Sequence, residues 1–206
     1  GVRVSDGLRV VNTDASGEFR IRVGRDSGPF LFITTPSGHH CNSFYVTTAD
    51  AVTTRPLFRL TPRSRDLSHR LVYMTDVHLG EGNAAESNRR MSQTIDEINS
   101  LDPLPDACWV GGDISLDHRQ GPAYIKLVSR LKMPVKHSVG NHEFQLKTDD
   151  PLNRFRQLFG PTYYSWNTGT LHCITLDGCH IDTTAGQPGK VIGQFGRREL
   201  QWLAAD

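Results

Sequence analysis

Three polar clusters, each placed directly after an apolar run, dominate the second part of this 206-residue chain. The clusters are Asp76-Val77-His78, Gly111-Gly112-Asp113 and Gly140-Asn141-His142-Glu143. His78 and Asp113 are 35 residues apart, Asp113 and His142 are 29 apart, and each interval has room for one helix and one strand. Because the carboxyl ends of parallel strands meet at one edge of a sheet, this spacing predicts an α/β layer that brings the clusters together.

The apolar pattern after residue 70 alternates between strand and helix periods, as such a layer requires. Expected strands cover residues 71–75, 107–111, 135–139, 163–167 and 171–176, and expected helices cover 85–101, 122–131, 151–159 and 195–205. In the first helix Met91, Ile95 and Ile98 recur at spacings of four and three, which predicts one buried face. Pro103 and Pro105 then end it.

The first sixty residues show a different pattern. Short apolar and β-branched runs, separated by Gly, Asp and Ser turn signals, cover residues 8–11, 18–23, 30–34, 44–48 and 51–60. Strands of that length and spacing predict a small all-β sandwich at residues 1–60. We therefore expect a linker over residues 61–69 and an α/β domain over residues 70–206.

Composition removes some classes of function. Lys plus Arg (23) nearly equals Asp plus Glu (22), so the chain shows no strong preference for nucleic acid or for an anionic membrane. No apolar run reaches the roughly 18 to 20 residues needed to span a bilayer. The four cysteines include no C-x-x-C pair. A Cys173–Cys179 bridge stays open as an alternative, and with it the redox compartment.

The residue types in the clusters suit a hydrolase with two metal ions, which activate water and offset charge on phosphoryl oxygens. Asp76 and His78, at i and i+2 on a strand exit, can hold one ion. Asp113, after two glycines that permit close backbone approach, can bridge both ions. Asn141 can offer its amide oxygen to the second ion. His142 would face the leaving group as general acid.

Each cluster also has a structural alternative. Asp-x-His is a common tripeptide, Gly-Gly-Asp is often a turn, and Gly-Asn-His can be a strand-end turn with Asn in a left-handed conformation. The order and spacing of all three favour the metal site over coincidence. For Tyr163, Tyr164 and Trp166, sheet packing is favoured over a base-stacking platform.

Together the three clusters resemble the signature of the calcineurin-like metallophosphoesterases over residues 70–206. The resemblance implies two β-sheets packed between helices, a dinuclear Mn, Fe or Zn centre, and hydrolysis of phosphomonoesters or phosphodiesters. It implies the same roles for the five residues named above, and a supporting role for Glu143 beside the ligands.

The first segment has a softer resemblance, carried by Val4-Ser5-Asp6-Gly7 and Thr13-Asp14-x-x-Gly17-x-Phe19. These motifs look like the carboxypeptidase-regulatory-like or transthyretin-like sandwich, which precedes the phosphoesterase in a group of bacterial, often exported enzymes. The resemblance therefore implies an extracytoplasmic location, secreted or periplasmic, which the residues themselves leave open.

The sequence also departs from the family pattern. The family supplies further histidines beyond the last helix, including a Gly-His-x-His, and the sandwich opens with a strand before Val4. We therefore expect a fragment cut at both ends, with weak metal binding and little or no activity. The alternative is a non-catalytic protein whose sandwich binds envelope glycan or protein and whose phosphoesterase part is a degenerate scaffold. A nucleic-acid phosphodiesterase is disfavoured by the balanced charge.

Overall fold

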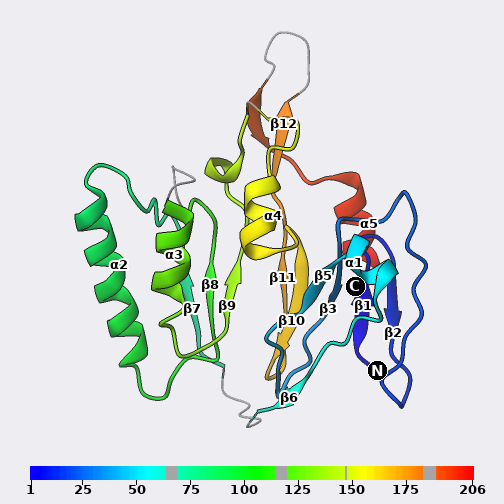
Figure 1. Cartoon of the computed structure of the whole chain (residues 1–206). Helices are drawn as coiled ribbons and strands as arrows, with labels where there is room; N and C mark the ends of the chain where they lie inside the picture. Colours follow the sequence, from blue (N-terminus) through cyan, green and yellow to red (C-terminus); the bar gives the residue numbers. More distant parts are fainter. Residues whose placement is uncertain (64–68, 115–119, 147, 183–188) are drawn as a thin grey trace. The chain divides into compact units, whose positions relative to one another are not determined.

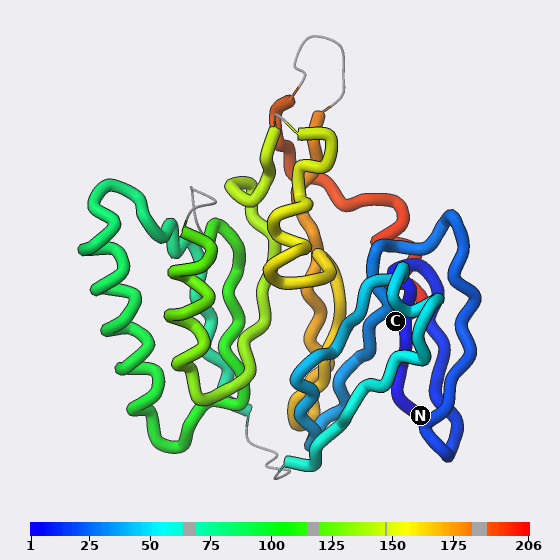
Figure 2. Tube along the Cα trace, viewed as in Figure 1, coloured from blue at the N-terminus to red at the C-terminus, as the bar shows by residue number. Residues whose placement is uncertain are grey.

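The computed structural model describes residues 1–63, 69–114, 120–146, 148–182 and 189–206. These residues form two compact units, traced in Figure 2. Unit 1 consists of Gly1–Ser68, Gly160–Asp177 and Phe195–Asp206, and unit 2 of His69–Phe159 and Gly178–Gln194. Most of the predicted linker, residues 64–68, lies outside the described residues. In the described part of the chain, no helix combines the length and apolar character that a membrane span requires.

Unit 2 is built on a three-stranded parallel sheet with the order β7-β8-β9. Its strands are β7 (Leu71–Met74), β8 (Ala107–Val110) and β9 (Val135–His137), and the helices between them are α2 (Ala84–Asn99) and α3 (Gly121–Val128). Figure 1 shows α2 and α3 alongside one another beside this sheet. The predicted α/β layer is therefore present, and its three strand exits lie at one edge.

The core of unit 2 forms around the apolar face predicted for α2. Met91, Ile95 and Ile98 are buried against residues of the sheet that include Cys108 and Val110. Burying a side chain of this size contributes roughly 1.5–3 kcal/mol. The helix begins one residue earlier than predicted because the Asn83 side chain caps it, accepting the N–H groups of residues 85 and 86 at 3.0 and 3.2 Å.

Three further parts complete unit 2. They are the 3-10 turn η2 (Asn141–Glu143), the helix α4 (Asn153–Phe159) and an antiparallel hairpin of β12 (Cys179–Asp182) and β13 (Lys190–Gly193). His137 of β9 stacks on Phe159 of α4, and its Nε2 lies 2.9 Å from the Tyr124 hydroxyl. Burial lowers the pKa of His137 to about 3, so this histidine is a neutral packing residue.

Unit 1 contains a four-stranded antiparallel sheet with the order β2-β1-β3-β5, and a short β4–β6 pair. The strands are β1 (Arg3–Ser5), β2 (Val10–Asn12), β3 (Phe30–Ile33), β4 (His39–His40), β5 (Tyr45–Thr47) and β6 (Thr61–Pro62). Val4, Leu31, Ile33 and Cys41 form its apolar core. The same unit includes the hairpin of β10 (Tyr164–Thr168) and β11 (Leu171–Thr175), and the helix α5 (Arg197–Ala205).

Two of the predicted strands in unit 1 are wrong. Residues 18–23 are extended and alternate between inward and outward side chains, but they are assigned to no sheet. Residues 51–60 begin inside a helix, α1 (Thr48–Thr53), because Thr47 accepts the Asp50 N–H at 3.0 Å as its N-cap. The two-layer sandwich and the domain boundaries expected at residues 60 and 70 stay predictions.

All four cysteines lie in the described residues and carry free thiols. The Cys173–Cys179 bridge that the sequence left open is not formed. Burial raises the pKa of the Cys108 thiol to about 11, which suits a small apolar packing residue rather than a nucleophile.

Candidate metal centre

The loops that leave β7 and β8 continue side by side beyond the strands. The backbone N–H of His78 donates to the Asp113 carbonyl at 2.9 Å, and the Leu79 N–H donates to the Ile114 carbonyl at 2.9 Å. These bonds place the first two polar clusters against one another. They follow from the parallel register, in which Met74 lies opposite Val110.

The backbone of these loops is left-handed at three non-glycine residues. Among the residues that the structure describes, positive φ outside glycine occurs at Asp76 (54°), His78 (44°) and Asp113 (50°). A left-handed conformation costs an L-residue about 1 kcal/mol, so it persists where the surrounding structure imposes it. Such outliers concentrate at functional sites. Here they coincide with three of the four predicted metal ligands.

The second and third loops approach so closely that only glycine fits between them. A Cβ on Gly112, whose φ is +95°, would lie 2.5 Å from the backbone nitrogen of Gly140. A Cβ on Gly140 would overlap the Asp113 carboxylate. The glycines therefore set the distance between the loop that carries Asp113 and the turn that carries Asn141 and His142.

The Glu143 carboxylate ties the same two loops together. Its oxygens accept the backbone N–H groups of Asp113 at 2.9 Å, Ile114 at 2.8 Å and Gly140 at 2.7 Å. Burial raises the pKa of Glu143, whereas its three backbone hydrogen bonds favour the charged form. The backbone N–H of His142 also donates to Asp113 Oδ1 at 3.0 Å.

The fold brings His78, Asp113 and His142 together. One potential ligand atom from each lies within 4.8 Å of the others. The rings of His78 and His142 are perpendicular, with centroids 4.9 Å apart. His78 Nε2 is 3.7 Å from Asp76 Oδ1 and 4.0 Å from Asp113 Oδ2. A carboxylate–imidazole set of this kind suits a divalent transition metal ion.

One observation tests whether these residues fit a metal ion. The Nδ1 atom of His78 is buried and makes no hydrogen bond to any described residue. Glu81 Oε2 stands 3.8 Å from it, beyond hydrogen-bond distance. The other ring nitrogen, Nε2, faces the Asp76 and Asp113 carboxylates, and an imidazole nitrogen placed toward two carboxylates fits a metal site.

Asp76 and Asn141 lie at the margin of this group. Asp76 is exposed and oriented by Thr75, whose hydroxyl donates to Asp76 Oδ2 at 2.7 Å. Asn141 is exposed and begins η2, directly before His142. The group whose ligand atoms all lie within 4.8 Å of one another includes His142, which the sequence assigned to the leaving group, and does not include Asp76.

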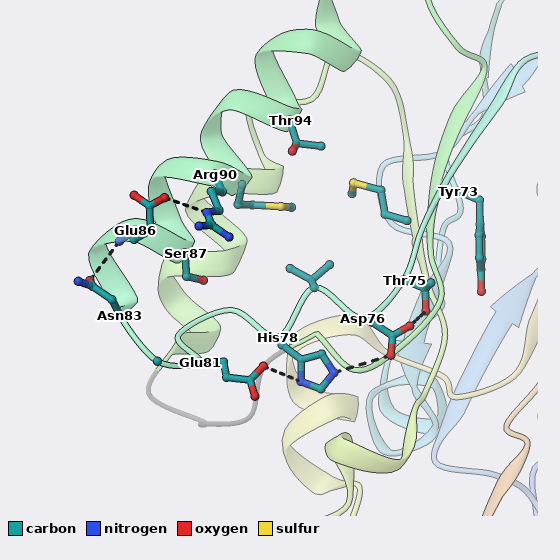
Figure 3. A pocket seen from close by; sticks show the side chains of 14 residues that line it. Tyr73, Thr75, Asp76, His78, Glu81, Asn83, Glu86, Ser87, Arg90 and Thr94 are labelled. Carbon is teal, nitrogen blue, oxygen red and sulfur yellow. Dashed lines mark hydrogen bonds and ion pairs between the residues drawn. The ribbon is translucent and has the colours of Figure 1, made fainter.

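Beside Asp76 and His78 lies an open pocket of about 830 Å³ between the exit of β7 and α2. Figure 3 shows His78 between Asp76 and Glu81, with Glu86 and Arg90 on the facing helix. Hydrogen bonds from the side chains of Arg89 and Arg90 lower the pKa of Glu86 to about 2. The Glu86 carboxylate on this helix is therefore ionised at neutral pH and paired with Arg90.

Sequence reasoning missed two residues here, Thr75 and Glu81. Glu81 returns to His78 through a tight turn in which its N–H donates to the His78 carbonyl at 3.0 Å. Its position three residues after the histidine was the available signal, but acidic residues on loops are common. Thr75 lies at the predicted strand end and gave no separate signal.

A family model described as calcineurin-like phosphoesterase matches residues 69–204. Among solved structures, the chain is similar to the protein of unknown function AQ665 from Aquifex aeolicus, with 15% identity and a TM-score of 0.33. That similarity covers 66% of this chain and 71% of the other. No curated protein matches the chain.

Proposed function

Because the chain belongs to the calcineurin-like phosphoesterase family, we propose that it hydrolyses a phosphomonoester or phosphodiester at the edge of the β7-β8-β9 sheet. Members of the family are generally phosphoesterases, and the match spans the three polar clusters. The proposed substrate is thus a phosphate ester. The loops around the site would select the alcohol part of that ester.

The coincidence of backbone strain and ligand chemistry carries this proposal. Asp76, His78 and Asp113 are the residues outside glycine that are left-handed in the described chain. A fold that holds three such residues at adjacent strand exits, against their conformational preference, supports a role for their side chains that packing does not explain.

We assign Asp76 and His78 to a first metal ion, Asp113 to a bridge between two ions, and Asn141 to the second. Mn, Fe and Zn all suit these oxygen and imidazole donors. When bound, the ions supply Lewis acidity that activates water and offsets the charge of the phosphoryl oxygens. The protein contributes fixed positions: Thr75 orients Asp76, and Glu143 holds the backbone of Asp113.

His142 is proposed as the general acid that protonates the departing alkoxide. Its side chain is exposed, so an incoming ester can reach it. Its backbone N–H is fixed by Asp113 Oδ1 at 3.0 Å, which holds the imidazole beside the ligands. An imidazole near neutral pH suits this proton transfer.

We expect the 206-residue polypeptide to bind metal weakly and to turn over slowly. The four proposed ligands offer two carboxylates, one imidazole and one amide oxygen to two ions. Fewer ligands per ion leave more water in the coordination sphere and lower the affinity for the metal.

We also propose an extracytoplasmic location, which rests on the resemblance of the first segment to the sandwich of exported enzymes.

The decisive experiment measures Mn²⁺ binding by calorimetry together with slow turnover of bis-p-nitrophenyl phosphate. Asp113→Asn should abolish binding and turnover together. Asp102→Asn, the same change at an exposed loop position, should alter neither. A chain that binds no Mn²⁺, Fe²⁺ or Zn²⁺ at any accessible concentration would contradict the proposed site.

The role of His142 has a separate test. His142→Ala should lower turnover much more for a phenyl ester than for a p-nitrophenyl ester, because a good leaving group needs no proton. Metal binding should fall much less than in His78→Ala. Equal loss for both esters, with loss of the metal, would instead identify His142 as a ligand.

A further inference from the structure

Two extended segments of unit 1 lack the hydrogen-bonded neighbours that extended backbone normally has. They are residues 19–23 and residues 55–60, and both alternate between half-buried and exposed side chains. Phe19 and Phe58 join them by a ring contact with centroids 6.4 Å apart. The backbone groups of these segments make no hydrogen bond with any described residue. Both segments therefore present backbone N–H and C=O groups that an added β-strand could hydrogen-bond.

A groove of about 1110 Å³ lies between the first segment and the α1 end of the second. Its apolar lining includes Ile21, Val23 and the buried Leu31. Val52 and Leu57 also line it, and they are 65% and 79% exposed. Large apolar side chains that remain this exposed beside a groove mark a surface that lacks a partner.

The outward side chains along the two segments carry positive charge. Arg20, Arg22, Arg55 and Arg59 are all exposed, and none forms an ion pair with a described residue. Asp14 and Glu18 also line the groove, where they offset the charge of Arg20 and Arg55, the two arginines of its lining. Arg22 and Arg59, exposed on the outward side of the two segments, leave a net positive charge for a partner.

We propose that this groove binds an extended acidic segment of a partner protein by β-strand addition. An added strand would satisfy the free backbone groups of residues 19–23. Its inward side chains would cover Ile21 and Val23, and its outward side chains would lie across from Arg20 and Arg22. The segment should therefore alternate between apolar and acidic residues.

The alternation of apolar and cationic residues with period two favours a peptide over other polyanions. Along residues 19–23 the apolar and cationic positions alternate strictly, so charge and apolar surface lie on opposite sides of the same backbone. A strand matches both sides at once because its own side chains alternate with period two. A polysaccharide or a nucleic acid would use the charge and leave both the backbone groups and the apolar floor unmatched.

The test uses the full chain and a short peptide of alternating glutamate and valine, with blocked ends and a fluorescent label. Binding is measured by anisotropy at low salt. The double variant Arg20→Glu/Arg55→Glu should weaken binding at least about tenfold, since it turns two attractions into repulsions. Arg197→Glu, an exposed arginine outside the groove, should change it less than about twofold.

Changes in the peptide keep the test independent of how the variants fold. Two methylated peptides are compared, one carrying N-methyl groups on the odd-numbered residues and the other on the even-numbered residues. A strand donates hydrogen bonds to its neighbour on alternate residues only, so one methylated peptide should bind weakly and the other as well as the parent. Equal binding of both methylated peptides and the parent would overturn strand addition. So would dextran sulfate, which has no peptide backbone, if it bound as tightly as the peptide at equal charge.

Discussion

Glu143→Ala offers the sharpest test of how the candidate metal centre is held. The change removes the carboxylate that accepts three backbone N–H groups, those of Asp113, Ile114 and Gly140, at 2.7 to 2.9 Å. All three donors sit where the Asp113 loop meets the η2 turn. Loss of their acceptor should loosen the contact between these two loops and, with it, the proposed ligand set.

The expected loss of stability follows from the three hydrogen bonds that the change removes. A bond to a charged group contributes roughly 1.5–3 kcal/mol, so three would contribute about 4.5–9 kcal/mol if nothing opposed them. The desolvation that raises the pKa of Glu143 opposes them, and water can enter after truncation. We expect unit 2 to lose about 3 kcal/mol of stability. Glu143→Gln, which keeps one acceptor oxygen, should lose about half of that.

Amide hydrogen exchange can measure both effects in one experiment. Peptides that span α2 report the stability of unit 2. Peptides that contain residues 113–114 and 140 report the contact between the Asp113 loop and the η2 turn. Glu97→Ala, at an exposed position of α2, is the matched control and should stay within about 0.5 kcal/mol of the parent. Unchanged exchange at residues 113–114 in Glu143→Ala would refute the bridging role.

Three further predictions concern other parts of the fold. Gly112→Ala should cost at least about 2 kcal/mol more than Gly82→Ala in chemical denaturation, because both glycines have positive φ but a Cβ on Gly82 meets no neighbour. Unit 1 should lose stability between about pH 5 and pH 8, by roughly 2–3 kcal/mol, because burial raises the pKa of Glu199 to about 7 and its folded state holds the proton longer than the unfolded chain. Urea titrations across that range should show the slope, and Glu199→Gln should flatten it. Excess Mn²⁺ should raise the melting temperature of the parent, EDTA should reverse the shift, and His78→Ala should show none.

Periodicity made much of unit 2 predictable. Its helices α2, α3 and α4 begin and end within three residues of the expected bounds, and so does α5 of unit 1, because apolar faces and proline stops are strong local signals. The order of clusters placed Asp76, His78 and Asp113 at neighbouring strand exits. The fine geometry was not predictable. No local pattern shows that the Glu143 carboxylate would reach the N–H groups of Asp113 and Ile114, about thirty residues away.

Unit 1 shows where the same signals fail. Residues 18–23 have the alternation of a strand, yet alternation reports only an extended backbone and a half-buried surface, not a ladder partner. Residues 48–53 are rich in Thr and Val, which favour strands, but the reciprocal contacts between Thr47 and Asp50 begin a helix instead. The β12–β13 hairpin was not predicted, because each of its four-residue strands has only two apolar residues.

The origin of the proposed ligands from three parallel strand exits also bears on folding kinetics. The site closes two loops of 35 and 29 residues, so His78, Asp113 and His142 meet only after β7, β8 and β9 have paired. Interactions that form after the rate-limiting step slow unfolding and leave the folding rate almost unchanged. A bound metal ion should therefore slow the unfolding of unit 2, and so lengthen the lifetime of its native state, while leaving its folding rate almost unchanged.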